Sequence, residues 1–175
     1  TIVNAYIEEK MEVSMPLFVA GIKDTEWTIK RTSKNIETAN LLLELVAGKT
    51  SPLYNELLSE GLINNNFSTE YFYGNGYSAL LFEGESNNAK LVQERILSAI
   101  EEIKQNGADE SLFGDLKRKL YGKKIRAYSD AEGSVDEMIG CIMEDFEPFE
   151  SLTALESVSL EDIKALANQL KSENF

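Results

Sequence analysis

The chain has 175 residues, carries a formal net charge of −13 and contains no histidine. Histidine titrates near neutral pH and is the commonest metal ligand. A histidine-based catalytic triad, an H-x-x-E-H zinc helix and an imidazole general base are therefore excluded within these residues. The excess negative charge argues against nucleic acid and anionic membranes as partners. The composition, 43% hydrophobic and 27% charged, fits one globular domain with a sizeable core, and we expect a binding or supporting domain.

The ends of the chain and its cysteine set further bounds. No run of about 18 apolar residues is present, which predicts no transmembrane helix. The first residues, T-I-V-N, show neither an initiator methionine nor a signal-peptide pattern. We expect residues 1–12 to be a linker from a missing upstream domain and residues 13–175 to be a single domain. Cys141 has no second cysteine to pair with, and we interpret it as a small buried residue on a helix.

The charges are unevenly distributed along the chain. Basic residues cluster within 117–126, whereas Lys164 is the sole basic residue between Ala127 and Ala165, where acidic residues are frequent. Such runs are typical of solvated helix faces. The alternative is a basic face that packs against an acidic sibling domain.

The first predicted elements are a strand and a helix. Residues 15–22, M-P-L-F-V-A-G-I, form a short apolar run that favours a strand. Pro16 cannot donate a ladder hydrogen bond, so it belongs at a sheet edge or a strand start. Thr32 or Ser33 can cap the following helix, whose apolar residues recur at helical spacing until Gly48.

A second helix and a hairpin follow. Ser51-Pro52 opens a helix that ends at Gly61, with proline at the first helical position. The apolar period then changes from about 3.6 to 2 over residues 63–84. Asn75-Gly76 separates the two alternating runs and predicts a hairpin turn in which both central residues have positive φ.

The rest of the chain is predicted to be helical. Apolar residues at helical spacing indicate helices over 89–103 and 109–125. Capping-box patterns at Ser134 and Ser159 predict the starts of two more helices. An early strand can join a later hairpin, so the order of elements predicts an α+β domain: an antiparallel sheet with helices packed on one face.

Several phrases resemble the second domain of the insulinase/pitrilysin-type zinc peptidases, the inverted zincins that include mitochondrial processing peptidase. The phrase G-K-T-S-P-L-Y-N-E-L-L-S-E-G-L at 48–62 is similar to the family's helix start, its "L-[YF]-x-E-L" and its "G-L". The resemblance lies in the order and spacing of the phrases over about residues 13–170, and small bacterial cytoplasmic members are the most similar. The match continues through 67–73, Gly76, 83–86 and L-E-S-V-S-L-E-D-I-K-A-L-A at 155–167.

The resemblance implies an insulinase/processing-peptidase-like fold and a set of partners. In that family each subunit pairs two α+β domains, and two pairs close around a peptide. Zinc sits on an H-x-x-E-H helix of the first domain, with a downstream glutamate as third protein ligand. The resemblance thus implies no metal in this chain, zinc in a partner N-terminal domain of the same parent chain, a peptide substrate, a homo- or heterodimer with a family member, and a bacterial cytoplasmic location.

The resemblance also points to two positions of a substrate clamp. Many members carry an Arg-x6-Tyr pair placed to contact the scissile peptide and the oxyanion. Counted back from Gly61-Leu62, these positions fall on Leu57, or on Leu58 with a one-residue gap, and on Asn64. Leucine cannot hydrogen-bond an oxygen, and asparagine is a shorter, neutral donor. We therefore expect a degenerate clamp and no catalytic residue in this chain.

The candidate substrate-binding residues are Asn64, Phe67, Tyr71 and Tyr73. Aromatic side chains on the hairpin can wall a peptide, and an exposed strand edge can pair with an extended peptide. The alternative is that the aromatic rings pack against the helical layer and that Asn64 serves the turn.

Two functions remain open from the sequence. The first is the C-terminal, non-catalytic half of a zinc-dependent metalloendopeptidase, which walls the peptide-binding chamber and supports a metal-bearing domain. The second is a catalytically inactive scaffold or assembly subunit of the same family. A free-standing binding module would require residue 1 to lie near the true start of the protein.

Overall fold

The structure, a computed structural model, describes residues 6–24 and 31–175 of the chain. Its sheet is antiparallel, with strand order β1-β3-β2. Of the predicted linker 1–12, residues 1–5 lie outside the described residues, and residues 6–12 form neither helix nor strand. The strands are β1 (Leu17–Lys23), β2 (Ser68–Gly74) and β3 (Tyr77–Glu85).

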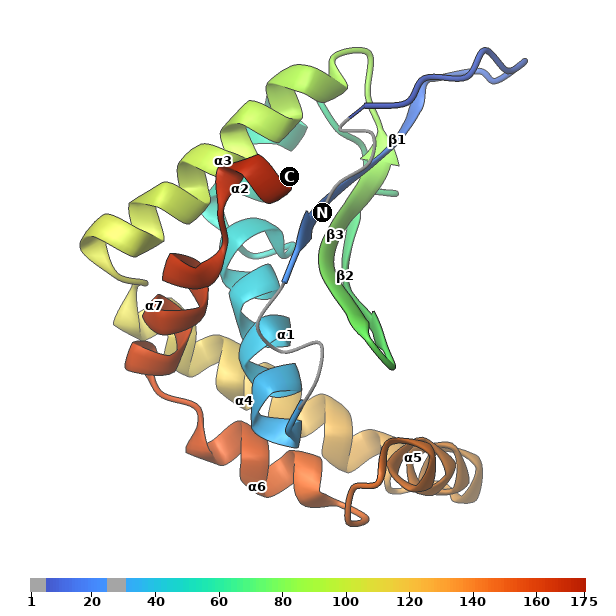
Figure 1. Ribbon diagram of the computed structural model, residues 1–175, viewed down its shortest axis with the longest axis vertical. Coiled ribbons are helices and arrows are strands. Elements are labelled where there is room, and N and C mark those ends of the chain that lie inside the picture. Colours follow the sequence, from blue (N-terminus) through green and yellow to red (C-terminus); the bar gives the residue numbers. More distant parts are fainter. Residues whose placement is uncertain (1–5, 25–30) are drawn as a thin grey trace.

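The helices lie on one face of this sheet, and no helix of the described segments covers the opposite face (Figure 1). This confirms the predicted α+β fold with helices on one side. The central helix, α1, is buried on nearly all sides because it lies between the sheet and the outer helices. The helices are α1 (Ser33–Ala47), α2 (Pro52–Ser59), α3 (Ala89–Asn106), α4 (Glu110–Ala127), α5 (Ala131–Glu144), α6 (Glu150–Ser157) and α7 (Leu160–Gln169), followed by the short 3₁₀ helix η1 (Ser172–Asn174).

The core fills the space between the sheet and the helices. Strand alternation sends every second side chain of the sheet toward α1, where it is removed from water. Helices α3 and α7 close the far side of α1. The inward-facing residues of the sheet are Phe18, Ile22, Tyr71, Tyr73, Ser78, Leu80 and Phe82, and they meet Leu41, Leu42, Val46, Ile96, Ile100, Ile163 and Leu166 of the helices.

Several predicted helix caps are confirmed. The Thr32 side chain accepts a hydrogen bond from the backbone N–H of Asn35, and the Asn35 side chain accepts one from Thr32 in return. The Ser51 hydroxyl accepts from the N–H of Tyr54 with proline next in the chain. The Ser159 hydroxyl likewise caps α7. These side chains satisfy backbone donors that have no partner within the helix.

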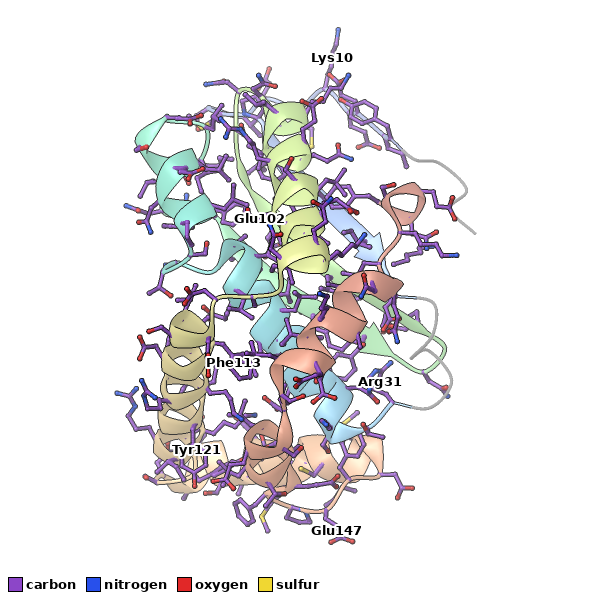
Figure 2. The ribbon with its side chains drawn as sticks, turned by 90° about the vertical axis from the view of Figure 1, so that its left-hand side faces the viewer. Lys10, Arg31, Glu102, Phe113, Tyr121 and Glu147 are labelled. Atoms are coloured by element: carbon purple, nitrogen blue, oxygen red, sulfur yellow. The ribbon has the colours of Figure 1, made fainter. Side chains whose placement is uncertain are left out.

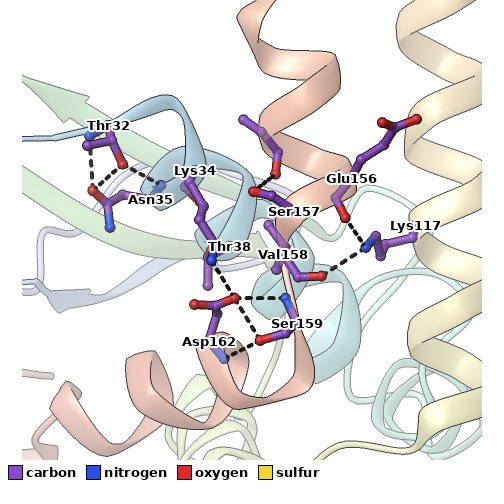
Figure 3. A network of polar contacts seen from close by, with 11 residues as sticks. Thr32, Lys34, Asn35, Thr38, Lys117, Glu156, Ser157, Val158, Ser159 and Asp162 are labelled. Carbon is purple, nitrogen blue, oxygen red and sulfur yellow. Dashed lines mark hydrogen bonds and ion pairs between the residues drawn. The ribbon is translucent and has the colours of Figure 1, made fainter.

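A polar network joins α1, α4 and α7 (Figure 3). The Lys34 ammonium lies 2.8 Å from Asp162 Oδ2. The Lys117 ammonium donates to the carbonyl oxygens of Glu156 and Val158, each at 2.8 Å. These carbonyls stand at the end of α6, so Lys117 satisfies acceptors that a helix terminus leaves open.

Two local predictions are wrong, and one helix was not predicted. Helix α5 begins at Ala131 with Asp130 as its cap, not at a capping box on Ser134, because the Asp130 side chain accepts from the N–H of Gly133. In the hairpin turn only Gly76 has positive φ, +87°, so the predicted turn with two positive-φ residues does not form. Helix α6 follows a cap without a side-chain hydrogen bond, Phe149 at φ +65°, and the sequence shows no polar cap signal there.

No helix in the described part of the chain is long and apolar enough to cross a membrane.

Candidate functional site

The two positions that the resemblance assigns to the clamp lie in the last turn of α2, at Leu57 or Leu58, and in the connection from α2 to β2, at Asn64. Gly61 has φ +68°, and the N–H of Leu62 donates to the carbonyl of Leu57 at 2.9 Å, which turns the chain off the helix. The Asn64 amide donates to the carboxylate of Glu85 at the end of β3. Its carbonyl oxygen accepts from the N–H of Asn66 at 2.9 Å. Asn64 thus ties this loop to the sheet.

Leu57 and Leu58 differ in burial. Leu57 is 1% exposed and belongs to the core, whereas Leu58 is only partly buried at the core's edge. A side chain that contacts a substrate needs access to solvent, which the position of Leu58 offers and that of Leu57 does not. Of the two leucines, only Leu58 has such access.

Phe67 lies inside the domain, immediately before β2. It is 1% exposed, and its ring centroid lies 6.4 Å from that of Phe18 and 6.1 Å from that of Tyr54. Aromatic pairs at such separations contribute packing energy beyond area burial. This placement favours the packing alternative for Phe67, which supports the sheet from behind.

Tyr71 and Tyr73 lie on the inward face near the hairpin end. Their ring centroids are 5.1 Å apart, and the Arg31 guanidinium lies 4.3 Å from the centroid of the Tyr73 ring. Arg31 also donates to the carbonyl oxygens of Gly74 and Tyr77, at 2.9 and 3.2 Å. The arginine thereby holds both strands at the turn, and Tyr73 remains half-buried beside it.

A buried polar group adjoins this cluster and was missed by the sequence reasoning. Asp24 is 3% exposed and follows β1 directly. Its side-chain Oδ2 accepts a hydrogen bond from the Tyr71 hydroxyl at 3.4 Å, and its main-chain oxygen accepts one from the Ser78 hydroxyl at 3.3 Å. Burial, with the nearby Asp24 carboxylate, raises the pKa of Tyr71. A run of apolar strand residues that ends in an aspartate was the available signal for this group.

The opposite face of the sheet is open to solvent and largely apolar. Leu17 and Val19 of β1 are 65% and 67% exposed, and the rings of Phe72 and Tyr77 are 5.3 Å apart. Both β1 and β2 are edge strands, because β3 lies between them. Such a surface offers apolar contacts on its face and main-chain groups at its edges, which is the chemistry that holds an extended peptide. Acidic residues Glu70, Glu83 and Glu85 share the open face.

The helical side carries a cavity of about 290 Å³ between α1, α4 and β2. Glu37, Lys123 and Lys124 contribute its charged groups, and Thr69 reaches it from the sheet. Glu37 is engaged by Lys124 at 2.9 Å. Two of the charged groups that line the cavity, Glu37 and Lys124, therefore satisfy each other.

Nothing in the described parts of the chain assembles a metal site: no three His, Cys, Asp or Glu side chains converge there. Cys141 is buried on α5, as predicted, with Sγ 4.0 Å from Glu137 Oε1. Burial and that carboxylate raise the pKa of the Cys141 thiol, which opposes formation of a nucleophilic thiolate. Cys141 is therefore poorly suited to act as a nucleophile.

Comparison with known proteins agrees with this α+β fold. The profile of the peptidase M16 inactive domain matches residues 7–120. Uncharacterized zinc protease YmfH of Bacillus subtilis (strain 168) is 28% identical over 161 residues, 90% of this chain and 37% of that protein. A candidate M16-like peptidase from Alicyclobacillus acidocaldarius superposes with a TM-score of 0.81 at 27% identity, over 93% of this chain and 39% of that chain.

A further solved structure shows the same fold in a domain of similar size. The inactive peptidase domain of a candidate zinc protease from Bordetella parapertussis superposes with a TM-score of 0.74 at 12% identity, over 93% of this chain and 89% of that one. Because the profile covers more than half of its length, the chain belongs to the peptidase M16 inactive domain family. It spans about two fifths of the length of the first two relatives.

Proposed function

We propose that this domain is the non-catalytic half of a zinc-dependent metalloendopeptidase, where it walls the peptide-binding chamber and supports a metal-bearing domain. The observation that carries the proposal is the match to an inactive peptidase domain in a chain with no histidine. Zinc peptidases of this type need histidine ligands on a helix. Those ligands must come from another domain.

The open face of the sheet is the proposed wall of the chamber. Its exposed apolar residues and its edge strands β1 and β2 can contact an extended peptide without any change in the core. Asn64 and Tyr73 remain candidates for contact because both are only partly buried. Phe67 and Tyr71 support the sheet from its inner face and do not contact the peptide, since their side chains pack in the core.

The remaining partners follow from this role. The N-terminal domain of the same parent chain supplies the zinc, residues 1–12 form the linker toward it, and the assembled protein is a homo- or heterodimer with a family member that encloses a peptide. We place the protein in the bacterial cytoplasm. The coverage of about two fifths of the relatives' lengths leaves room for such a domain.

A second function, a catalytically inactive scaffold subunit, has one specific observation in its favour. Neither clamp position carries a group that can act on a scissile peptide: the first is a leucine whether it falls on Leu57 or on Leu58, and both polar groups of the Asn64 side chain are engaged by Glu85 and Asn66. In that case the catalytic chain would be a separate subunit.

The sequence upstream of residue 1 and the zinc content of the full-length parent protein discriminate between the two functions. An upstream H-x-x-E-H and about one bound zinc per chain, lost on changing its first histidine to alanine, are expected for the peptidase. An upstream domain without that motif, together with a parent protein free of zinc after metal loading, would support the scaffold and contradict the peptidase.

A further inference from the structure

Helix α5 turns its apolar side to solvent. Apolar residues recur along it at i, i+3, i+4, i+7 and i+8, the spacing of a single helix face. In a globular domain such a face normally packs against the core. Here every member of this stripe is exposed: Val135 53%, Met138 41%, Ile139 51%, Ile142 75% and Met143 80%.

The polar side of the same helix points inward and fixes this orientation. Glu137 receives the Tyr128 hydroxyl at 2.8 Å and the Ser151 hydroxyl at 3.0 Å. The Ser134 hydroxyl donates to the carbonyl of Tyr128 at 3.1 Å. At 100° per residue, Ile139 lies opposite Glu137. The apolar stripe therefore faces away from the domain because the inward side is occupied by hydrogen bonds.

The stripe stands apart from the helical layer. In Figure 1, α5 lies at the lower right, seen nearly end-on, beyond the end of α4. Among the described elements, α1 packs against α4, α6 and α7, and α5 takes no comparable part. Phe149, 41% exposed, continues the apolar surface, and its ring meets Tyr128 edge-on at 4.9 Å. A contiguous exposed apolar surface of this kind marks an interaction site.

The charges on α5 and on the segment that follows it are acidic, whereas the basic residues Lys123, Lys124 and Arg126 belong to the end of α4 before it. Glu132 and Asp136 are exposed on α5 itself, Glu147 points outward at the end of the molecule, and no basic residue occurs in the sequence from Ala127 to Ile163. In Figure 2, Glu147 lies at the opposite end of the molecule from Lys10. A second copy of this chain would bring acidic rims together, and an anionic membrane would be repelled.

We propose that the α5 stripe, defined as Val135, Met138, Ile139, Ile142 and Met143, is a docking surface for an amphipathic helix of a partner protein whose apolar face is flanked by lysine or arginine. An apolar helix face supplies the area, and basic flanks complement the acidic rim. This surface lies on α5, apart from the open face of the sheet, and goes beyond the proposed peptidase role.

Two synthetic helical peptides test the proposal. Both carry the same leucine stripe, and one has lysine flanks while the other has glutamate flanks. Fluorescence anisotropy with the 175-residue chain is expected to show binding of the lysine peptide, at least about tenfold weaker binding of the glutamate peptide, and weakening of the lysine peptide with salt. The double variant I142Q/M143Q is expected to bind the lysine peptide at least about tenfold more weakly than the unchanged chain.

The matched control is the double variant I7Q/M11Q, which removes apolar side chains of comparable exposure from the N-terminal segment, outside the open sheet face, and is expected to leave binding unchanged. Ile142 and Met143 are largely exposed, so I142Q/M143Q and the control variant should both keep the thermal unfolding midpoint of the unchanged chain. If I142Q/M143Q lowers that midpoint, the single variant M143Q is used in its place. Equal binding of both peptides, or equal losses in both double variants, would overturn the proposal. So would a chain dimer abolished by I142Q/M143Q in sedimentation, or binding to neutral phosphatidylcholine vesicles in place of the peptide.

Discussion

The Lys124 ammonium lies 2.9 Å from Glu37 Oε1, and the Glu37 side chain is 4% exposed. This pair joins α4 to α1, the central helix of the domain. Burial raises the pKa of Glu37, although the Lys124 ammonium acts to lower it, and Glu137 adds to the rise. Keeping the Glu37 carboxylate ionised in the folded domain therefore costs free energy, and this cost grows as the pH rises.

We predict that Glu37 gives the domain a descending pH dependence of stability. A carboxyl whose pKa is higher in the folded chain binds its proton more tightly there, so its contribution is fully present below its unfolded-state pKa and is lost as pH rises through the folded-state pKa. Glu37→Gln should remove this slope, and Lys124→Met should steepen it and cost about 2–3 kcal/mol, because one charge of a buried pair is left alone. Urea unfolding midpoints from about pH 4 to about pH 8 measure both. A slope unchanged in Glu37→Gln would contradict the assignment.

The burial of the two leucines near the clamp positions leads to a second prediction. Leu57→Arg should destabilise the domain by at least about 3 kcal/mol, since it buries an unpaired charge in the core, whereas Leu58→Arg should cost less than about 1 kcal/mol. Thermal unfolding of the two variants measures the difference. Equal losses would show that Leu58 is as enclosed as Leu57.

The anchoring of α5 leads to a third prediction. Burial raises the pKa of Tyr128 to about 12, and the Glu137 carboxylate adds to the rise, so the hydroxyl stays protonated and donates at neutral pH. Tyr128→Phe removes this donor and should lower the free energy of unfolding by about 1 kcal/mol and speed amide exchange within α5 first. Tyr121→Phe, on the exposed side of α4, is the control and should leave exchange in α5 unchanged. Faster exchange in every helix alike would mean that Tyr128 supports the whole core instead.

The start of α7 leads to a fourth prediction. Burial acts to raise the pKa of Asp162, but hydrogen bonds from Lys34 and from Ser159 outweigh it and the pKa is lowered. The stabilisation is therefore present above the ordinary aspartate pKa and is lost as pH falls through the folded-state value. Asp162→Asn should cost about 0.5–1 kcal/mol at neutral pH, because the pair is partly exposed and screened, and the difference should shrink in acid. A difference that persists at about pH 2 would assign the loss to packing.

Periodicity and cap chemistry were sufficient for most of the fold. The Thr32 and Ser159 caps follow from side chains that hydrogen-bond to the nearby backbone, and the hairpin position follows from the conformational freedom of Gly76. Two helix starts did not follow from these signals. Asp130 outcompeted Ser134 as the cap of α5, and α6 was missed because Phe149 gives no polar cap.

The candidate site was less predictable than the fold. Alternation places Phe67 and Tyr71 on one side of the strand, but only the position of the helical layer shows that this is the inner side. The contacts of Asp24 and Arg31 with the hairpin join residues far apart in the chain, which periodicity cannot reveal. The exposure of the α5 stripe was likewise hidden, since an amphipathic pattern does not state which side faces solvent.

The most direct test of the central claim is one assay of peptide hydrolysis. A quenched fluorescent peptide library is incubated with zinc and this chain alone, with the metal-bearing half of the parent alone, and with both together. We predict no hydrolysis by this chain, little or none by the other half, and strong hydrolysis by the mixture, which is lost when the zinc-binding histidines are changed. Zinc-dependent hydrolysis by this chain alone, or full activity of the other half without it, would contradict its role as the non-catalytic half of a zinc peptidase.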